Sequence, residues 1–203
     1  KRLGRDFTLK GLREEGYEAV FLAVGAPKGA LLGLPGENVN GVVDAIRFLK
    51  EYNLTGSAQV GQTVIVVGGG NAAIDAARSA IRLGAKSVTV VYRRTRAEMP
   101  AYVEEIDEAQ REGVHLMVLT APVEVVSEGG RAKGLKCRKM VLGEFDKSGR
   151  QSPKASDEPE FVLPADQIIA AIGQSLDVNE LTNGFDLKAT QRQTIEAHPM
   201  TGQ

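Results

Sequence analysis

Short apolar runs recur along the chain and are separated by longer segments with helical spacing. The runs occupy residues 17–29, 63–67, 87–94 and 166–175, and most of them end in glycine or polar residues. Short runs of this kind are typical of strands that are buried on both faces of a parallel sheet. The sequence therefore predicts a set of central parallel strands.

Three segments between and after these runs predict helices. They cover residues 41–53, 71–85 and 101–113. The first carries one apolar stripe, formed by Val42, Val43, Ile46, Leu49 and Tyr52. The second is rich in alanine and closes at Gly84. The third is charged, with a predicted apolar stripe of Val103, Ile106 and Ala109.

The rest of the pattern predicts antiparallel structure. Residues 115–130 predict two strands separated at Pro122, and residues 134–150 and 158–165 predict an antiparallel pair. The polar residues 147–159 are expected to form a loose, mobile tip. The order of elements implies an α/β fold: a Rossmann-like open parallel sheet with helices on both faces and a small antiparallel insertion before the last strand.

Composition and charge narrow the classes of function. The 203 residues are 42% hydrophobic and 25% charged, which is typical of a globular protein. The net charge of -1 provides no global field, so neither nucleic acid nor a membrane surface is expected as a partner. No apolar run is long enough to span a bilayer and the first residues lack a signal-peptide pattern, so a cytoplasmic location is expected.

The cysteines and histidines exclude several kinds of site. A single cysteine, Cys137, cannot form an internal disulfide or a CxxC redox pair, and it cannot supply the four thiolates of an iron–sulfur cluster. His115 and His198 are far apart in sequence, with no further ligand at the spacing of a zinc site. No metal site is therefore expected in this chain.

Residues 64–73, VIVVGGGNAA, predict a dinucleotide site. They fit the pattern G-x-G-x-x-[G/A] with Gly68, Gly70 and Ala73, directly after a strand and at the start of a helix. Gly68 allows the tight turn, Gly70 lets the backbone approach a pyrophosphate, and Ala73 lets the helix pack close to the strand. The helix N-terminus adds N–H donors and the positive end of its dipole. Close helix–strand packing alone is the alternative.

The next strand predicts which dinucleotide binds. In NAD-binding units the end of this strand usually carries an acidic residue for the ribose 2′-hydroxyl, whereas here the segment reads VVYRRTR. Arg93 and Arg94 occupy that place, with Arg96 close by, and a guanidinium matches a phosphate. One such contact predicts a preference for NADPH over NADH of roughly 30- to 150-fold. A solvated arginine cluster is the alternative.

Residues 64–101, which include the stretch YRRTRAEMP, resemble the small (beta) subunit of NADPH-dependent glutamate synthase and its relatives, together with residues 17–29 and 166–174. Those relatives include the NADPH-binding half of dihydropyrimidine dehydrogenase and ferredoxin:NADP oxidoreductase subunits. All are similar to the FAD/NAD(P)-dependent pyridine nucleotide-disulfide oxidoreductases. The resemblance covers nearly the full chain.

The resemblance implies a domain organisation. Residues 1–36 would be a remnant of the FAD-binding unit, 37–62 a crossover helix and linker, 63–185 the NAD(P)H-binding domain, and 186–203 a return segment toward the FAD-binding unit. No second G-x-G-x-x-G, no Gly-Asp flavin motif and no cysteine cluster occur in the sequence. FAD is therefore expected in the full-length protein and not in this chain.

The resemblance also implies contacts for NADPH. The family's pyrophosphate contacts fall on Gly69, Gly70, Asn71 and Ala72, those to the 2′-phosphate fall on Arg93 and Arg94, and those near the nicotinamide fall on Ala171, Ile172 and Gly173. Arg96 matches a third basic residue that relatives place at a slightly different spacing. Capping of the helix is the alternative role for Asn71.

The expected chemistry is hydride transfer from NADPH to FAD, as the electron input of an oxidoreductase with a larger catalytic or iron–sulfur subunit. The cofactors carry this chemistry, so no catalytic side chain is expected. A non-catalytic nucleotide-sensing or subunit-docking domain is one alternative. A disulfide reductase of the thioredoxin-reductase kind is another, and it would need a CxxC pair that this sequence lacks.

Overall fold

The computed structural model describes residues 3–145, 149–176, 188, 190, 194–198, 200 and 201. The chain divides into two compact units, the first made of Lys1–Lys28 with Gln174–Gln203 and the second of Gly29–Gly173. The second unit contains all of the predicted site residues. The predicted return segment, residues 186–203, lies largely outside the described residues. The assignment of residues 1–36 and 186–203 to an FAD-binding unit stays a prediction.

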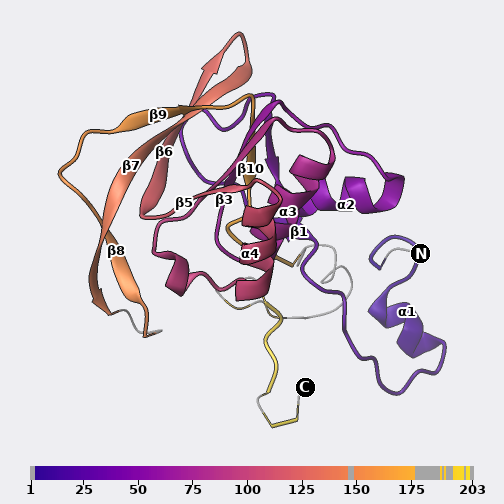
Figure 1. The fold of residues 1–203 in the computed structure, drawn as a ribbon. Helices are drawn as coiled ribbons and strands as arrows, with labels where there is room; N and C mark the ends of the chain where they lie inside the picture. Colours follow the sequence, from indigo (N-terminus) through magenta and orange to yellow (C-terminus); the bar gives the residue numbers. More distant parts are fainter. Residues whose placement is uncertain are drawn as a thin grey trace. The chain divides into compact units, whose positions relative to one another are not determined.

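A five-stranded parallel sheet forms the centre of the second unit (Figure 1). Its order is β2 (Val42–Asp44), β10 (Gln167–Ala170), β3 (Thr63–Val67), β4 (Ser87–Val91) and β5 (His115–Met117). Val67 aligns with Ala170 on one side and with Val91 on the other. The carboxyl ends of the three inner strands therefore lie in line at one edge, where open α/β sheets bind ligands.

Helices cover one face of this sheet. They are α2 (Ala45–Thr55), α3 (Asn71–Arg82) and α4 (Val103–Arg111). Four of the five side chains that α3 buries are alanines, and they pack with the alternating valines of β3 and β4: Ala73, Ala76, Ala77 and Ala80 against Val64, Val66, Val88 and Val90. Because alanine keeps the helix axis close to the sheet, the start of α3 lies directly beside the end of β3.

An antiparallel sheet covers the other face. Its strands are β6 (Thr120–Glu128), β7 (Arg131–Phe145), β8 (Gln151–Ala155) and β9 (Phe161–Pro164). Val125, Leu135 and Cys137 pack against Ile65, Val67 and Ile168 of the parallel sheet. The predicted α/β class with an antiparallel insertion is confirmed. Strands cover the face where further helices were also expected, because the insertion carries its own buried apolar side chains.

The first predicted helix begins later than its apolar stripe indicates. Val42 and Val43 belong to β2 and pair with Ile168 and Ile169, and the helix starts only after Asp44, whose Oδ1 accepts a hydrogen bond from Arg47 N at 2.9 Å. The stripe of the third helix is wrong at Val103, which is 61% exposed at the first residue of α4. The spacing of apolar residues alone does not distinguish the end of a strand from the first turn of a helix.

Two predictions for the insertion are also wrong. Residues 151–155, expected in a loose tip, form β8 and pair with β7 at Met140↔Ala155 and Leu142↔Pro153; residues 147 and 148 of that tip lie outside the described residues. The break expected at Pro122 falls at Leu119, which has a φ of 47°. Pro122 instead lies inside β6 beside a register shift, where the ladder tolerates a residue without an N–H.

The run at residues 17–29 is not a buried strand. Only its end, β1 (Lys28–Gly29), is extended in a ladder, and Phe21 is 92% exposed. A buried strand needs neighbours on both edges and cover on both faces, and the described residues supply neither for 17–27. The first unit also contains α1 (Leu9–Glu14) and β11 (Gln174–Ser175). None of the described helices is long and apolar enough to cross a membrane.

Candidate dinucleotide-binding site

Gly68 forms the turn between β3 and α3. Its N–H donates to Val91 O at 3.0 Å, and the N–H of Ala171 donates to Val67 O at 2.8 Å. With a φ of 150°, Gly68 passes so close to β10 that an added Cβ would lie 2.3 Å from Ala171 O. The turn therefore requires glycine, and it places Ala171 beside the glycine loop.

Gly69 and Gly70 face different surroundings. A Cβ at Gly69 would lie 2.5 Å from Cε2 of Tyr92, so the ring of this tyrosine packs directly on the loop. A Cβ at Gly70 would find only Pro100 Cγ, at 3.9 Å. Gly70 is the N-cap of α3 without a side-chain cap, and the first N–H groups of the helix lack intrahelical acceptors. The backbone there is open to an anionic ligand.

Asn71 and Ala73 serve the start of α3 in different ways. Ala73 is fully buried against the sheet, the packing role predicted for the third motif position. The alternative role predicted for Asn71, capping of its own helix, is wrong, because the N-cap is Gly70 and no side chain caps it. Asn71 Oδ1 accepts a hydrogen bond from Tyr102 N at 3.0 Å, which ties the start of α3 to the start of α4.

Tyr92 connects the glycine loop, Gly68–Gly70, to the arginine segment, residues 93–100. Its ring lies against Gly69, and its hydroxyl donates to Glu98 O at 2.9 Å in the turn η1 (Arg96–Glu98). Ala101 N donates back to Gly69 O at 3.1 Å. Tyr92 is not among the site residues predicted from the sequence. The signal in the sequence was a large aromatic residue at the end of the strand that follows the three glycines. Glycines have no side chains of their own to pack, so a neighbouring strand has to cover them.

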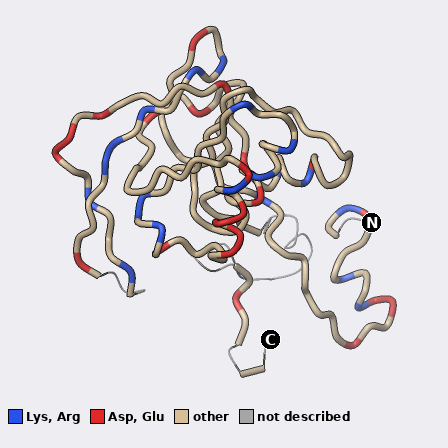
Figure 2. Tube along the Cα trace, in the orientation of Figure 1, with Lys and Arg blue, Asp and Glu red and all other residues tan. Residues whose placement is uncertain are grey.

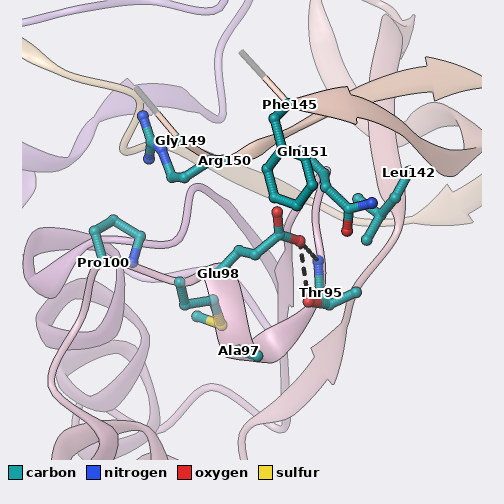
Figure 3. A pocket seen from close by; sticks show the side chains of 10 residues that line it. Thr95, Ala97, Glu98, Pro100, Leu142, Phe145, Gly149, Arg150 and Gln151 are labelled. Atoms are coloured by element: carbon teal, nitrogen blue, oxygen red, sulfur yellow. Dashed lines mark hydrogen bonds between the residues drawn. The ribbon is translucent and has the colours of Figure 1, made fainter. Parts of the chain in front are cut away.

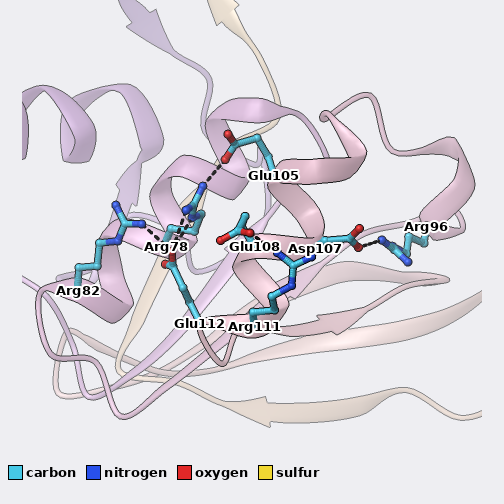
Figure 4. Close-up of polar contacts among 8 residues, drawn as sticks. All are labelled: Arg78, Arg82, Arg96, Glu105, Asp107, Glu108, Arg111 and Glu112. Atoms are coloured by element: carbon cyan, nitrogen blue, oxygen red, sulfur yellow. Dashed lines mark hydrogen bonds and ion pairs between the residues drawn. The ribbon is translucent and has the colours of Figure 1, made fainter.

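The three arginines have separate environments. Arg93 is exposed and has no ion-pair partner among the described residues. Arg94 is only 5% exposed, and its Nε donates to Gln151 O of β8 at 2.8 Å. Arg96 forms an ion pair with Asp107 of α4 (Figure 4). Of the three, Arg93 is the one most accessible to a phosphate.

The segment after β10 completes the edge. Ala171 is half-buried against Gly68, while Ile172 is 50% exposed. Gly173 has a φ of 152°, and its carbonyl accepts a hydrogen bond from Ala30 N at 3.0 Å. The structure thus brings the residues predicted for the pyrophosphate and nicotinamide parts of the cofactor together at the ends of β3 and β10.

Cys137 lies away from this edge and does not fit disulfide exchange. It is fully buried between the two sheets, and burial raises the pKa of its thiol to about 12. At neutral pH it is a neutral thiol without access to solvent, whereas exchange requires an accessible thiolate. Among the described residues, no group of His, Cys, Asp and Glu could hold a metal ion.

A parallel sheet, a glycine turn that opens a helix at its carboxyl edge, and an exposed arginine after the next strand define a Rossmann-type dinucleotide-binding domain of an oxidoreductase. Residues 3–200 match the family described as pyridine nucleotide-disulphide oxidoreductase. The chain belongs to this family.

Similar proteins support this membership. The beta subunit of NADP(+)-dependent formate dehydrogenase from Moorella thermoacetica is 41% identical over 98% of this chain. A putative glutamate synthase [NADPH] small chain from Cereibacter sphaeroides is 37% identical over 96% of it, so the predicted resemblance is confirmed. The chain spans only 28% of the first protein and 49% of the second.

The fold matches solved structures. Mycobacterium tuberculosis FprA in complex with NADPH superposes with a TM-score of 0.72 at 18% identity, covering 98% of this chain and 56% of that one. At this identity the likeness concerns the fold alone.

Proposed function

We propose that this chain is the NADPH-binding part of a larger flavoprotein oxidoreductase of the glutamate synthase small-subunit type. The observation that carries the proposal is the open backbone at Gly70, at the N-terminus of α3, on the same edge of the sheet as the exposed Arg93. The names of the relatives, which refer to NADP or NADPH, support it.

Each part of the cofactor has a candidate partner. The backbone of Gly69, Gly70, Asn71 and Ala72 would hold the pyrophosphate, because Gly70 leaves the space above it open. Arg93 would bind the 2′-phosphate. Ala171, Ile172 and Gly173 would lie on the nicotinamide side. When bound, NADPH would supply a hydride for FAD, and these residues would hold and orient the nucleotide, so no side-chain acid, base or nucleophile is required.

Arg94 and Arg96 have supporting roles in this proposal. Arg94 is buried, and its Nε donates a hydrogen bond to Gln151 O. This favours a role in positioning the arginine segment over direct contact with the phosphate. Arg96 would have to leave Asp107 before it could bind an anion.

The proposal also covers the longer protein to which this chain would belong. The relatives are named as subunits of larger enzymes, and this chain spans less than a third of the first of them. We propose that FAD binds in the full-length protein, that a larger catalytic or iron–sulfur subunit takes the electrons, and that the protein works in the cytoplasm.

A docking or nucleotide-sensing domain is the second candidate. The exposed apolar side chains of Tyr17 and Phe21, which are 57% and 92% exposed, favour it, because such a surface is typical of a binding interface. This candidate does not require that NADPH be preferred over NADH.

Calorimetric titration of the chain with NADPH and NADH tests the proposal. Replacing Arg93 by Gln is expected to weaken NADPH about 10- to 30-fold and NADH less than about threefold, because only NADPH carries the 2′-phosphate. Arg131→Gln is the matched control, since this exposed arginine lies at the start of β7. Equal losses for both nucleotides would contradict the role of Arg93. No binding of either to the unaltered chain would favour docking.

A further inference from the structure

A pocket lies between the arginine segment and the hairpin of β7 and β8 (Figure 3). Its volume is about 460 Å³, within the usual range for small-molecule sites. Glu98 and Pro100 line one side, and Leu142, Phe145, Arg150 and Gln151 of the hairpin line the other. None of these hairpin residues belongs to the motifs that predicted the dinucleotide site.

The pocket adjoins the glycine loop through Pro100. This proline lines the pocket, and its Cγ is also the nearest atom to the position of an added Cβ at Gly70, at 3.9 Å. The hydrogen bond from Ala101 N to Gly69 O keeps the two features together. A ligand whose phosphate binds at the start of α3 can therefore place its next chemical group in this pocket.

The walls of the pocket fit a purine nucleoside that carries a phosphate. Phe145 is 73% exposed and offers a flat ring face for stacking, and Arg150 supplies a cation on the same hairpin. On the opposite side, Glu98 Oε2 accepts hydrogen bonds from Thr95 N at 3.2 Å and Thr95 Oγ1 at 3.0 Å. This carboxylate repels a phosphate, so that side of the pocket suits an uncharged nucleobase and not an anion.

One side-chain and two backbone hydrogen bonds hold the hairpin against the arginine segment. Arg94 Nε donates to Gln151 O of β8 at 2.8 Å. Leu119 N donates to Arg94 O at 3.0 Å, and Leu119 O accepts from Met140 N of β7 at 2.8 Å. The left-handed conformation of Leu119 thus lets one residue join the arginine segment to the hairpin. Arg94 is a positioning residue in this arrangement.

We propose that this pocket binds the adenosine 2′-phosphate end of NADPH, with Phe145 stacked on the adenine and Arg150 joining Arg93 at the 2′-phosphate. The proposal rests on the proposed function, and it adds the antiparallel hairpin to a site that the motifs place on the parallel sheet alone. Phe145 then contributes to binding of any adenine dinucleotide, whereas Arg150 contributes to the preference for NADPH.

Titration of the 203-residue chain with NADPH, NADH and adenosine 2′,5′-bisphosphate tests this division. Phe145→Ala is expected to weaken all three about tenfold, because stacking on the base is common to them. Arg150→Gln is expected to weaken NADPH and the bisphosphate about tenfold and NADH less than about threefold. Val141→Ala on β7 and Lys154→Gln on β8 are matched controls, since neither residue lines the pocket.

A double variant tests the positioning role of Arg94. If Arg94 holds the hairpin in place, Phe145→Ala should cost little further affinity once Arg94 is replaced by Gln, so the two losses are not additive. Fully additive losses would overturn that role. NADPH binding that depends on Arg93 but is unchanged in Phe145→Ala and Arg150→Gln would overturn the pocket assignment and leave the proposed function standing. No nucleotide binding at all would overturn both.

Discussion

Gly68 and Gly70 lie two residues apart in one loop, yet glycine serves a different purpose at each of them. At Gly68 the protein itself fills the space, since an added Cβ would lie 2.3 Å from Ala171 O. At Gly70 the nearest atom would be 3.9 Å away, so the protein tolerates a methyl group there. The first glycine serves the fold, and the second leaves room for a ligand.

Substitution of these glycines should separate stability from binding. Gly68→Ala is expected to lower the free energy of unfolding by about 2–5 kcal/mol, because it adds backbone strain and a clash with a main-chain oxygen. Gly70→Ala should change it by less than about 1 kcal/mol and weaken NADPH about tenfold. Urea unfolding and nucleotide titration measure the two effects.

Gly84→Ala is the control for backbone strain. Gly84 has a φ of 99° and no atom within 4 Å of an added Cβ, so its replacement costs only the left-handed conformation, about 1–2 kcal/mol. A loss at Gly68 no larger than the loss at Gly84 would contradict the close approach of Ala171.

At the scale of elements, ion pairs join α3 to α4 (Figure 4). Arg78 of α3 donates to Glu112 Oε1 through Nε at 3.1 Å and Nη2 at 2.8 Å, and it also pairs with Glu105. Arg82 adds a third donor to the same oxygen at 2.6 Å. The pKa of Glu112 is lowered, chiefly by its hydrogen bond to Arg78. Because α3 begins directly after the glycine loop, these ion pairs help to fix the position of the helix that carries the site.

Glu112→Gln should therefore destabilise the protein in a way that depends on pH. A carboxyl group whose folded pKa is depressed stabilises the fold above its unfolded pKa, here 4.5, and this contribution is lost as pH falls through the lower folded value. The variant should be about 1–2 kcal/mol less stable at pH 7. Urea unfolding at several pH values should show this difference shrinking below about pH 4.5.

Glu108→Gln is the matched control on the same helix. Glu108 pairs with Arg111 within α4 and is 47% exposed, so its loss should cost at most about 0.5 kcal/mol. If Glu112→Gln and Glu108→Gln have equal effects at every pH, the contact between α3 and α4 contributes nothing beyond a surface ion pair.

At the scale of the whole molecule, charge does not favour one kind of nucleotide. Basic and acidic residues are interspersed along the chain, with acidic residues gathered along α4 (Figure 2). The net charge is -1. Discrimination between NADPH and NADH must therefore come from the few cations near the end of β4, on elements that belong to one compact unit, Gly29–Gly173.

Binding should raise the thermal stability of that unit. NADPH at a hundred times its Kd is expected to add about 2.7 kcal/mol to the free energy of unfolding, which corresponds to a rise in Tm of roughly 5–10 °C. NADH at the same concentration should give a rise smaller by about two thirds or more, because its affinity is expected to be roughly 30- to 150-fold lower. Calorimetric scans measure both, and equal shifts would contradict selection by the 2′-phosphate.

The sequence by itself determined the parts of the site that depend on neighbours along the chain. A strand, a glycine turn and an alanine-rich helix are specified by short-range patterns, and the structure has them at Thr63–Val67, Gly68–Gly70 and Asn71–Arg82. The arginines at 93 and 94 could likewise be read as the end of the next strand. These features need no knowledge of distant contacts.

Only the tertiary structure decided which side chains remain exposed and can contact a ligand. Arg93 and Arg94 are adjacent in sequence, but β8 covers one of them and leaves the other exposed, through a hydrogen bond that spans 57 residues. The run at 17–29 predicts a buried strand, yet its burial depends on neighbouring strands that the described chain does not provide. Local pattern sets the shape of a segment, whereas exposure and pairing are set by residues far away in the sequence.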